Sequence, residues 1–216
     1  MYQMHELAEL RDYVRFFITL IAVLDPFLAV PIYVGVTAQR NEASRNALAR
    51  VVTLTVLAVL VVSAVAGEAL LDLMGASLPA FRVGGGLVLL LMALAMLNAQ
   101  VGGVRQSQAE ANELQSGEAG GVVPLAIPLL AGPGAISTTI IAAEKGGATH
   151  LAVLAGCIAL VALLTWAALR QASGIAERLG VTGLNIATRI LGLLLAAMAV
   201  QTMAEGLKAL FPGLAG

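Results

Sequence analysis

The fold is decided by the stretch Leu24-Asp25-Pro26-Phe27-Leu28-Ala29-Val30-Pro31, in which two prolines interrupt an apolar segment. A second stretch has the same proline spacing and reads Ile127-Pro128-Leu129-Leu130-Ala131-Gly132-Pro133-Gly134. In each Pro-x-x-x-x-Pro motif Leu and then Ala hold the third and fourth positions, and the two motifs lie 102 residues apart. Proline lacks the N–H that a helix interior needs, and its ring clashes with the preceding turn. The stretches therefore predict two interrupted helices at equivalent places of a repeat.

The composition of the 216 residues predicts a membrane protein. Hydrophobic residues make up 59% of the chain and charged residues 12%, about half the ~25% of a soluble domain. A chain this apolar is neither a soluble globular domain nor a disordered one. The net charge of −1 offers no basic face to nucleic acid, and the single cysteine excludes a disulfide framework. We expect one all-α transmembrane domain over residues 1–216.

Six apolar segments are long enough to cross a bilayer, whose core needs roughly 20 apolar residues per helix. They lie near residues 13–37, 50–71, 80–100, 122–143, 149–170 and 187–210. The matched prolines divide them into repeat one (13–100), a polar loop (101–121) and repeat two (122–210). Because each repeat has three spans, the second runs inverted in the membrane, and matched broken helices are typical of a transporter site. We expect six transmembrane helices in two inverted three-helix repeats, with spans one and four broken.

The distribution of Lys and Arg predicts the orientation, because cytoplasmic loops carry more of them. The side with the loops near 37–50, 101–121 and 170–189 carries seven: Arg40, Arg45, Arg50, Arg105, Arg170, Arg178 and Arg189. The other side carries five: Arg11, Arg15, Arg82, Lys145 and Lys208. Seven against five places both termini on the outer side of the membrane.

The second proline motif belongs to a longer pattern, Val123-Pro124-Leu125-Ala126-Ile127-Pro128-Leu129-Leu130-Ala131-Gly132-Pro133-Gly134-Ala135-Ile136-Ser137-Thr138. Asp25-Pro26 with Pro31, Gly84-Gly85-Gly86 and the segment 189–201 extend the pattern over nearly the whole chain. It resembles the MarC family of bacterial inner-membrane proteins, also called the small neutral amino acid transporter family. The resemblance implies six spans, a multi-pass protein of the bacterial inner membrane, and movement of glycine, alanine and similar substrates. In that membrane the outer side predicted for both termini is the periplasmic side.

Asp25 is the one acid placed in the middle of a predicted span. A charge at the bilayer centre costs about 2.5–3.5 kcal/mol, so this side chain should face the bundle interior or a cavity. There it can bind a substrate ammonium, carry a coupling proton or hold a sodium ion. The alternative is a helix cap, because Asp followed by Pro is a common helix start.

The prolines also predict two helix N-termini at the substrate. A half-helix after Pro133 would offer the N–H groups of Gly134, Ala135 and Ile136, and the aligned half-helix after Pro31 would offer those of Ile32, Tyr33 and Val34. Helix N-termini favour an anion such as the substrate carboxylate. The predicted substrate-binding residues are Asp25, Pro26, Pro31, Ile32, Tyr33, Ala131, Gly132, Pro133, Gly134, Ala135, Ile136, Ser137 and Thr138.

Ser137 and Thr138 have two interpretations: their hydroxyls bind substrate, or they bond back to helix carbonyls, as is common in membrane helices. Enzyme functions are disfavoured, because the sequence has no His-Glu-x-x-His zinc motif, no Gly-x-Ser-x-Gly elbow and no Gly-rich phosphate loop. No cofactor is expected. The favoured function is a transporter for small neutral amino acids; the alternatives are a channel and a structural membrane protein. Substrate, transport direction, coupling ion and oligomeric state stay open.

Overall fold

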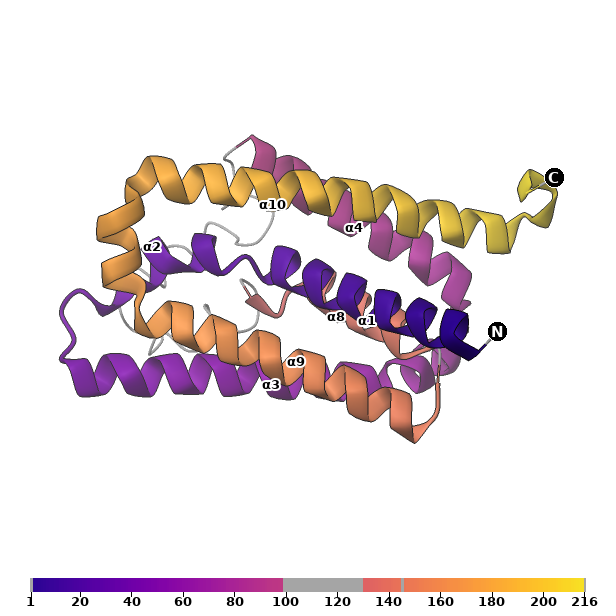
Figure 1. Ribbon diagram of the computed structural model, residues 1–216, viewed down its shortest axis with the longest axis horizontal. Helices are drawn as coiled ribbons and strands as arrows, with labels where there is room; N and C mark the ends of the chain where they lie inside the picture. The colour runs from indigo at the N-terminus through magenta and orange to yellow at the C-terminus, as the bar shows by residue number, and fades with distance from the viewer. Residues whose placement is uncertain (1, 99–129, 145, 216) are drawn as a thin grey trace.

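The computed structural model describes residues 2–98, 130–144 and 146–215, and every regular element within them is a helix. The helices are α1 (Tyr2–Leu24), α2 (Pro26–Thr37), α3 (Glu42–Leu73), α4 (Leu78–Leu97), α8 (Pro133–Ala143), α9 (Ala148–Arg170), α10 (Ala172–Leu210) and the short 3-10 helix η2 (Pro212–Ala215). They run roughly along one long axis, with both termini at the same end (Figure 1).

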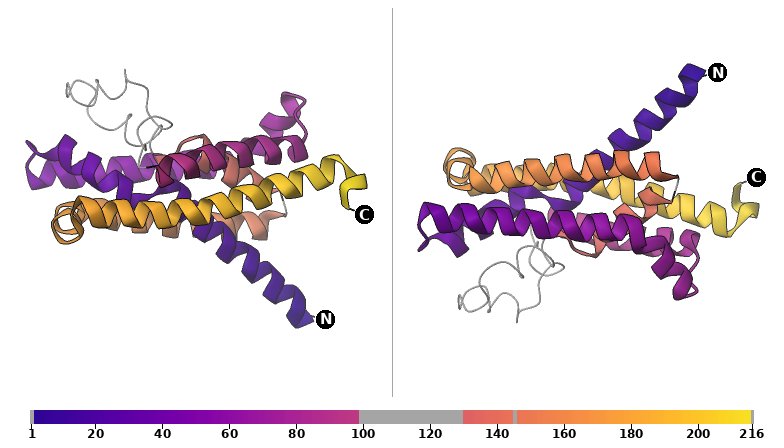
Figure 2. Two further views of the ribbon diagram at one scale, coloured as in Figure 1. Left: turned by 90° about the horizontal axis from the view of Figure 1, so that it is seen from above. Right: turned by 90° about the horizontal axis from the view of Figure 1, so that it is seen from below.

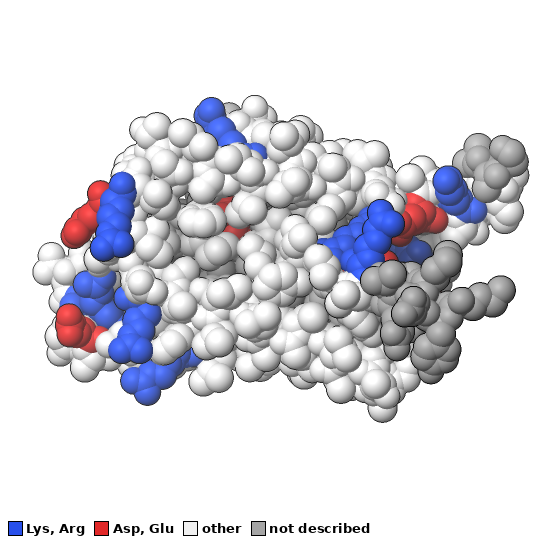
Figure 3. Space-filling view, viewed as in Figure 1, with Lys and Arg blue, Asp and Glu red and all other residues white. Residues whose placement is uncertain are grey.

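Five helical segments are long and apolar enough to cross a membrane: Leu10–Thr37, Glu42–Leu73, Leu78–Leu97, Ala148–Arg170 and Ala172–Leu210. A shorter apolar helix, Pro133–Ala143, coincides with the second part of the predicted span 122–143. The first part of that span, with Pro128, and the predicted polar loop 101–121 lie outside the described residues. Charged side chains gather mainly at the two ends of the molecule, and the surface between them is mostly uncharged (Figure 3). The protein is therefore an all-helical, multi-pass integral membrane protein.

The surface of the central band is apolar, as lipid contact requires. Large side chains that a soluble protein would bury are exposed on the outer faces of the long helices, including Leu54, Val65, Leu163 and Leu193. Lipid tails solvate such side chains, so the apolar surface costs nothing in a bilayer. The interior instead holds a continuous apolar cluster that α1, α2, α3, α4, α8, α9 and α10 all contribute to.

The two short helices α2 and α8 occupy the middle of the bundle, together with α1 (Figure 1). Figure 1 shows α10 and α4 side by side along one edge, α3 and α9 along the other, and α1, α2 and α8 between them. From above and below, the first half of α1 projects out of this layer (Figure 2). α2 and α8 start near the middle and run toward opposite ends, so two helix N-termini lie inside the protein (Figure 1).

Small residues let α4 and α10 approach closely. A Cβ added at Gly192 would lie 2.8 Å from Met96 Cβ and 3.2 Å from the Ala93 carbonyl oxygen. One added at Gly86 would lie 3.0 Å from the Ala199 carbonyl oxygen. Contacts this short exclude any side chain larger than hydrogen, which is how small residues bring membrane helices together.

The polar stretch predicted as a loop before the sixth span is helical instead. α10 begins at Ala172, and Gly180 is its one internal residue outside the helical region, with φ 61° and ψ 178°. Only glycine adopts this conformation without strain. A single residue therefore makes the bend that sequence patterning assigns to a whole polar segment.

Candidate functional site

The first break in the bundle is one residue long. Asp25 lies between α1 and α2 with φ 45° and ψ 74°, the left-handed region that Asp tolerates better than most residues. It is fully buried. Its Oδ1 accepts hydrogen bonds from the Leu28 N–H at 3.3 Å and from the Thr188 hydroxyl of α10 at 3.4 Å. The helix-cap interpretation is therefore confirmed, and the capping carboxylate is also bonded to α10.

Thr188 was not among the predicted site residues. It is buried, and its hydroxyl links α10 to the break between α1 and α2 by donating to Asp25. The sequence carried a weak signal: a hydroxyl residue stands directly before Arg189, at the start of the predicted sixth span. Nothing in the pattern shows that its partner is 163 residues away.

The expected half-helix after Pro31 starts earlier than predicted. α2 begins at Pro26, and Pro31 lies in its interior, so the N–H groups of Ile32 and Tyr33 are not at a helix N-terminus. The reason is that Asp25 caps a start at Pro26, whereas Val30 has no side-chain acceptor to cap a start at Pro31. Pro31 still interrupts the ladder, because it has no N–H for the Phe27 carbonyl.

The second helix start is at Pro133, as the aligned proline predicts. Gly132 is the N-cap in an extended conformation, and Pro133 occupies the first helical position. The Gly132 carbonyl accepts the N–H groups of Ala135 at 3.0 Å and Ile136 at 3.1 Å. Of the three donors expected here, two are thus bonded within the helix, and Gly134 supplies the remaining one. Ala131 and Gly132 are buried, and Pro133 is exposed.

Gly134 faces α4. A Cβ added to it would lie 2.5 Å from Met92 Sδ and 3.1 Å from Leu89 Cδ2. Its first physical role is therefore close packing of the α8 start against α4. The residue 102 positions earlier is Ile32, so the first proline motif has no glycine at the equivalent position.

Three consecutive hydroxyl residues of α8 behave differently. Ser137 donates to the Gly134 carbonyl at 3.1 Å, and Thr139 donates to the Ala135 carbonyl at 2.8 Å. These two follow the back-bonding alternative. Thr138 is 8% exposed, and its hydroxyl has no hydrogen-bond partner among the described residues. A buried unpaired hydroxyl costs about 1–3 kcal/mol, so a water molecule or a polar ligand that bonds to it would be stabilised.

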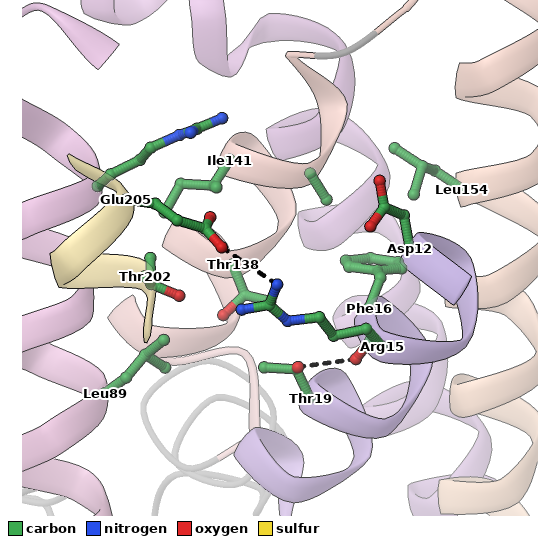
Figure 4. Close-up of a pocket in the computed structure, with 12 residues that line it drawn as sticks. Asp12, Arg15, Phe16, Thr19, Leu89, Thr138, Ile141, Leu154, Thr202 and Glu205 are labelled. Atoms are coloured by element: carbon green, nitrogen blue, oxygen red, sulfur yellow. Dashed lines mark hydrogen bonds and ion pairs between the residues drawn. The ribbon is translucent and has the colours of Figure 1, made fainter. Parts of the chain in front are cut away.

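Thr138 lines a cavity of about 110 Å³, which we call the α8 cavity. The lining residues are Asp12, Arg15, Phe16, Thr19, Arg82, Leu89, Thr138, Ile141, Ala142, Leu154, Thr202 and Glu205. Figure 4 shows Thr138 in the same cavity as Arg15 and Glu205, whose side chains form an ion pair with 3.2 Å between nitrogen and oxygen. Arg82 pairs with Glu144, the residue directly after α8. The charges that line the cavity are therefore balanced, two acidic and two basic.

Sequence reasoning assigned Arg15 and Arg82 to topology and overlooked Glu205. The missed signal was position: Arg15 lies within the predicted span 13–37, and Glu205 lies within the span 187–210. Ionisable residues inside membrane spans usually face a partner or a cavity.

A second cavity lies in the part of the bundle that α2 runs toward. It has a volume of about 310 Å³ and is lined by Tyr33, Glu42, Arg45, Asn46, Arg170 and Ser173; we call it the Arg45 cavity. The Tyr33 hydroxyl donates to the Arg45 carbonyl at 2.5 Å, and the Arg45 guanidinium donates to the Ser173 hydroxyl. The predicted site residues thus reach two different cavities, Thr138 in one and Tyr33 in the other. The described residues hold no group of three His, Cys, Asp or Glu able to ligate a metal.

Comparisons with known proteins agree with this architecture. The family model described as "MarC family integral membrane protein" matches residues 10–211. The "UPF0056 membrane protein YhcE" of Escherichia coli strain K12 is 37% identical over 203 residues, covering 94% of each chain. The "UPF0056 membrane protein MJ1677" of Methanocaldococcus jannaschii is 32% identical over 206 residues, covering 93% of this chain and 98% of its own. No solved structure matches. With the match over residues 10–211, the chain belongs to the MarC family of integral membrane proteins.

Proposed function

We propose that the protein transports small neutral amino acids of the glycine and alanine class, rather than catalysing a reaction. The observation that carries the proposal is the α8 cavity, in which a buried Thr138 hydroxyl without a partner lies among balanced charges. A neutral amino acid is a zwitterion, with one carboxylate and one ammonium. A cavity that offers one guanidinium and one carboxylate side by side, Arg15 and Glu205, suits both groups at once.

The size of the cavity supports a small substrate. Its volume of about 110 Å³ leaves room for several water molecules. Glycine has five non-hydrogen atoms and alanine has six, so either can replace that water.

The two breaks supply the same two kinds of group deeper in the bundle. Asp25 offers a negative charge for the substrate ammonium, and the last carbonyls of α1 lie at the negative end of that helix. The start of α8 offers the Gly134 N–H and a positive dipole end for the carboxylate. We propose that the substrate is held mid-membrane between them. A coupling proton or a sodium ion would also use Asp25, since a carboxylate and helix-end carbonyls are suitable oxygen ligands.

The transport cycle that we propose uses six helices in two inverted repeats. The predicted fourth span, 122–143, would raise the number of spans from five to six, with α8 as its second part. The α8 cavity would give the substrate access from one side of the membrane. The Lys and Arg count supports a periplasmic position for the α8 cavity and both termini in a bacterial inner membrane, and a cytoplasmic position for the Arg45 cavity.

Uptake of radiolabelled glycine, alanine and serine into proteoliposomes tests the proposal. A transporter gives saturable uptake that responds to an imposed proton or sodium gradient. A channel, the first alternative, gives flux proportional to concentration without exchange. A structural membrane protein, the second, gives no flux above that of empty liposomes, and either of these results would remove the proposal.

A further inference from the structure

We propose that the Arg45 cavity binds the phosphate group of an anionic membrane lipid. The cavity holds about 310 Å³ at the meeting point of α2, α3, α9 and α10. This proposal is independent of amino acid transport, because it rests on a different cavity with a different charge.

The charge of the Arg45 cavity is unbalanced. Arg45 and Arg170 both line it, together with one acid, Glu42. Neither arginine forms an ion pair within the described residues, whereas both arginines of the α8 cavity are paired. Two guanidinium groups without acidic partners select an anion with at least two oxygens, and a phosphate matches their planar geometry. A zwitterion would leave one of these charges unmatched.

The polar groups around the arginines are also donors. Ser173 accepts a hydrogen bond from Arg45, so its own O–H remains to donate to a ligand. Ser173 lies in the first turn of α10, where no side-chain cap satisfies the helix N–H groups within the described residues. The N-terminus of α3 contributes Glu42, Arg45 and Asn46 to the same cavity. The C-terminus of α9 also ends there, at Arg170, so the helix dipoles partly offset one another and the two arginines supply the positive charge.

The surroundings of Arg170 indicate a lipid rather than a soluble phosphate. Its guanidinium carbon lies 5.2 Å from the centre of the Trp166 ring, one turn earlier on α9. Tryptophan is enriched at the level of the lipid headgroups. The next turns of α9 expose Leu160, Leu163 and Leu164 to the surroundings. A lipid can therefore place its phosphate between the arginines and its acyl chains along the apolar face of α9.

Native mass spectrometry of the full chain in neutral detergent, titrated with phosphatidylglycerol, tests the proposal. We expect the wild type to retain the lipid and Arg170→Gln to weaken its affinity about fivefold. The double variant Arg45→Gln/Arg170→Gln should weaken it about 25-fold if the two effects multiply. Arg50→Gln is the matched control, because Arg50 is an exposed residue of α3 that does not line the cavity. It should change the affinity less than twofold.

Arg45 also links α3 to α10 through Ser173, so its loss can unfold the protein. If it does, the exposed Arg170→Gln variant replaces the double variant in the test. Arg45→Lys is then measured beside it as a folded variant at position 45. An equal loss in Arg50→Gln would show that lipid binding follows total charge, and it would overturn the proposal. Displacement of the lipid by millimolar inorganic phosphate would identify a soluble anion as the ligand. Displacement by glycine would assign the cavity to the transport path, and either result contradicts a lipid site.

Discussion

The two proline motifs have the same spacing, yet they start their helices at different prolines. α2 begins at the first proline of its motif, Pro26, and α8 begins at the second proline of its motif, Pro133. Asp25 precedes one start and Gly132 precedes the other. The residue before the proline therefore determines which proline starts the helix, because that residue occupies the N-cap position.

This difference makes the two breaks chemically complementary. The first buries a carboxylate at a left-handed residue and ties it to Thr188 across the bundle. The second has no side-chain cap and presents backbone groups alone. One break thus supplies negative charge and the other supplies backbone donors, which are the two things a zwitterion needs.

The largest effect is expected from replacing Asp25, whose carboxylate distinguishes the first break from the second. Asn retains cap geometry and tolerates the left-handed conformation, so Asp25→Asn should fold. It removes the charge, and we expect the initial rate of glycine uptake to fall about a hundredfold, since hydrogen bonds to charged groups contribute about 1.5–3 kcal/mol. Asp25→Ala is the comparison, because it removes the cap as well and should also destabilise the protein.

Uptake measured across pH separates the charge from the cap. Wild type should respond to pH if Asp25 carries a coupling proton, and Asp25→Asn should not. Identical rates and pH profiles for the two proteins would show that Asp25 is a cap and nothing more.

Replacing the second proline of each motif should change the stability of the protein by different amounts. Pro31→Ala supplies an N–H for the Phe27 carbonyl inside α2 and should stabilise the protein by up to about 3 kcal/mol. Pro133→Ala changes a first-turn position, where proline costs nothing, so we expect less than about 0.5 kcal/mol. Thermal unfolding in detergent measures both. Equal shifts would mean that the two prolines occupy equivalent helix positions.

Gly134→Val tests the close approach found only at the second break. Its Cβ would lie within 2.5 Å of Met92 Sδ, so we expect a loss of about 1–3 kcal/mol from overpacking. Gly35→Ala in α2 is the control, because nothing lies within 4 Å of its Cβ position and the change should be neutral or stabilising. A second change, Met92→Ala, should recover much of the loss. Equal stability of Gly134→Val and wild type would contradict the packing of α8 against α4.

The smallest expected effect is at Thr138. Thr138→Val removes a buried hydroxyl that has no partner in the described residues, so stability should stay constant or rise. The KM for glycine should increase about three- to tenfold, since one hydrogen bond contributes about 0.5–1.5 kcal/mol. Ser137→Ala is the matched control, because that hydroxyl bonds within its own helix. An unchanged KM in Thr138→Val would remove this hydroxyl from the site.

Much of the fold could be predicted from local sequence. Apolar segments and proline spacing predict the helices and the start of α8 at Pro133, because both depend on neighbouring residues. The start of α2 could also have been found, since Asp25-Pro26 is a local cap signal that competes with Pro31. Gly180 shows the limit of patterning: one residue bends a helix that polarity alone predicts as a loop.

Only those parts of the site that depend on neighbouring residues in the sequence were predictable. Asp25 and the α8 start are recognisable from their own motifs. The pairing of Arg15 with Glu205 and of Asp25 with Thr188 joins residues more than 160 positions apart. One sequence contains no sign of which distant helices meet, so these partners come from the packing of the bundle alone.

The central claim is that the protein recognises both charged groups of a small amino acid, and competition for labelled glycine uptake tests it most directly. Proteoliposomes would receive labelled glycine with an excess of unlabelled alanine, acetate or methylamine. We predict that alanine, a zwitterion, inhibits uptake, and that acetate and methylamine, which each carry one of the two charges, do not. Inhibition by either single-charge compound as strong as that by alanine, or no saturable glycine uptake at all, would contradict the claim.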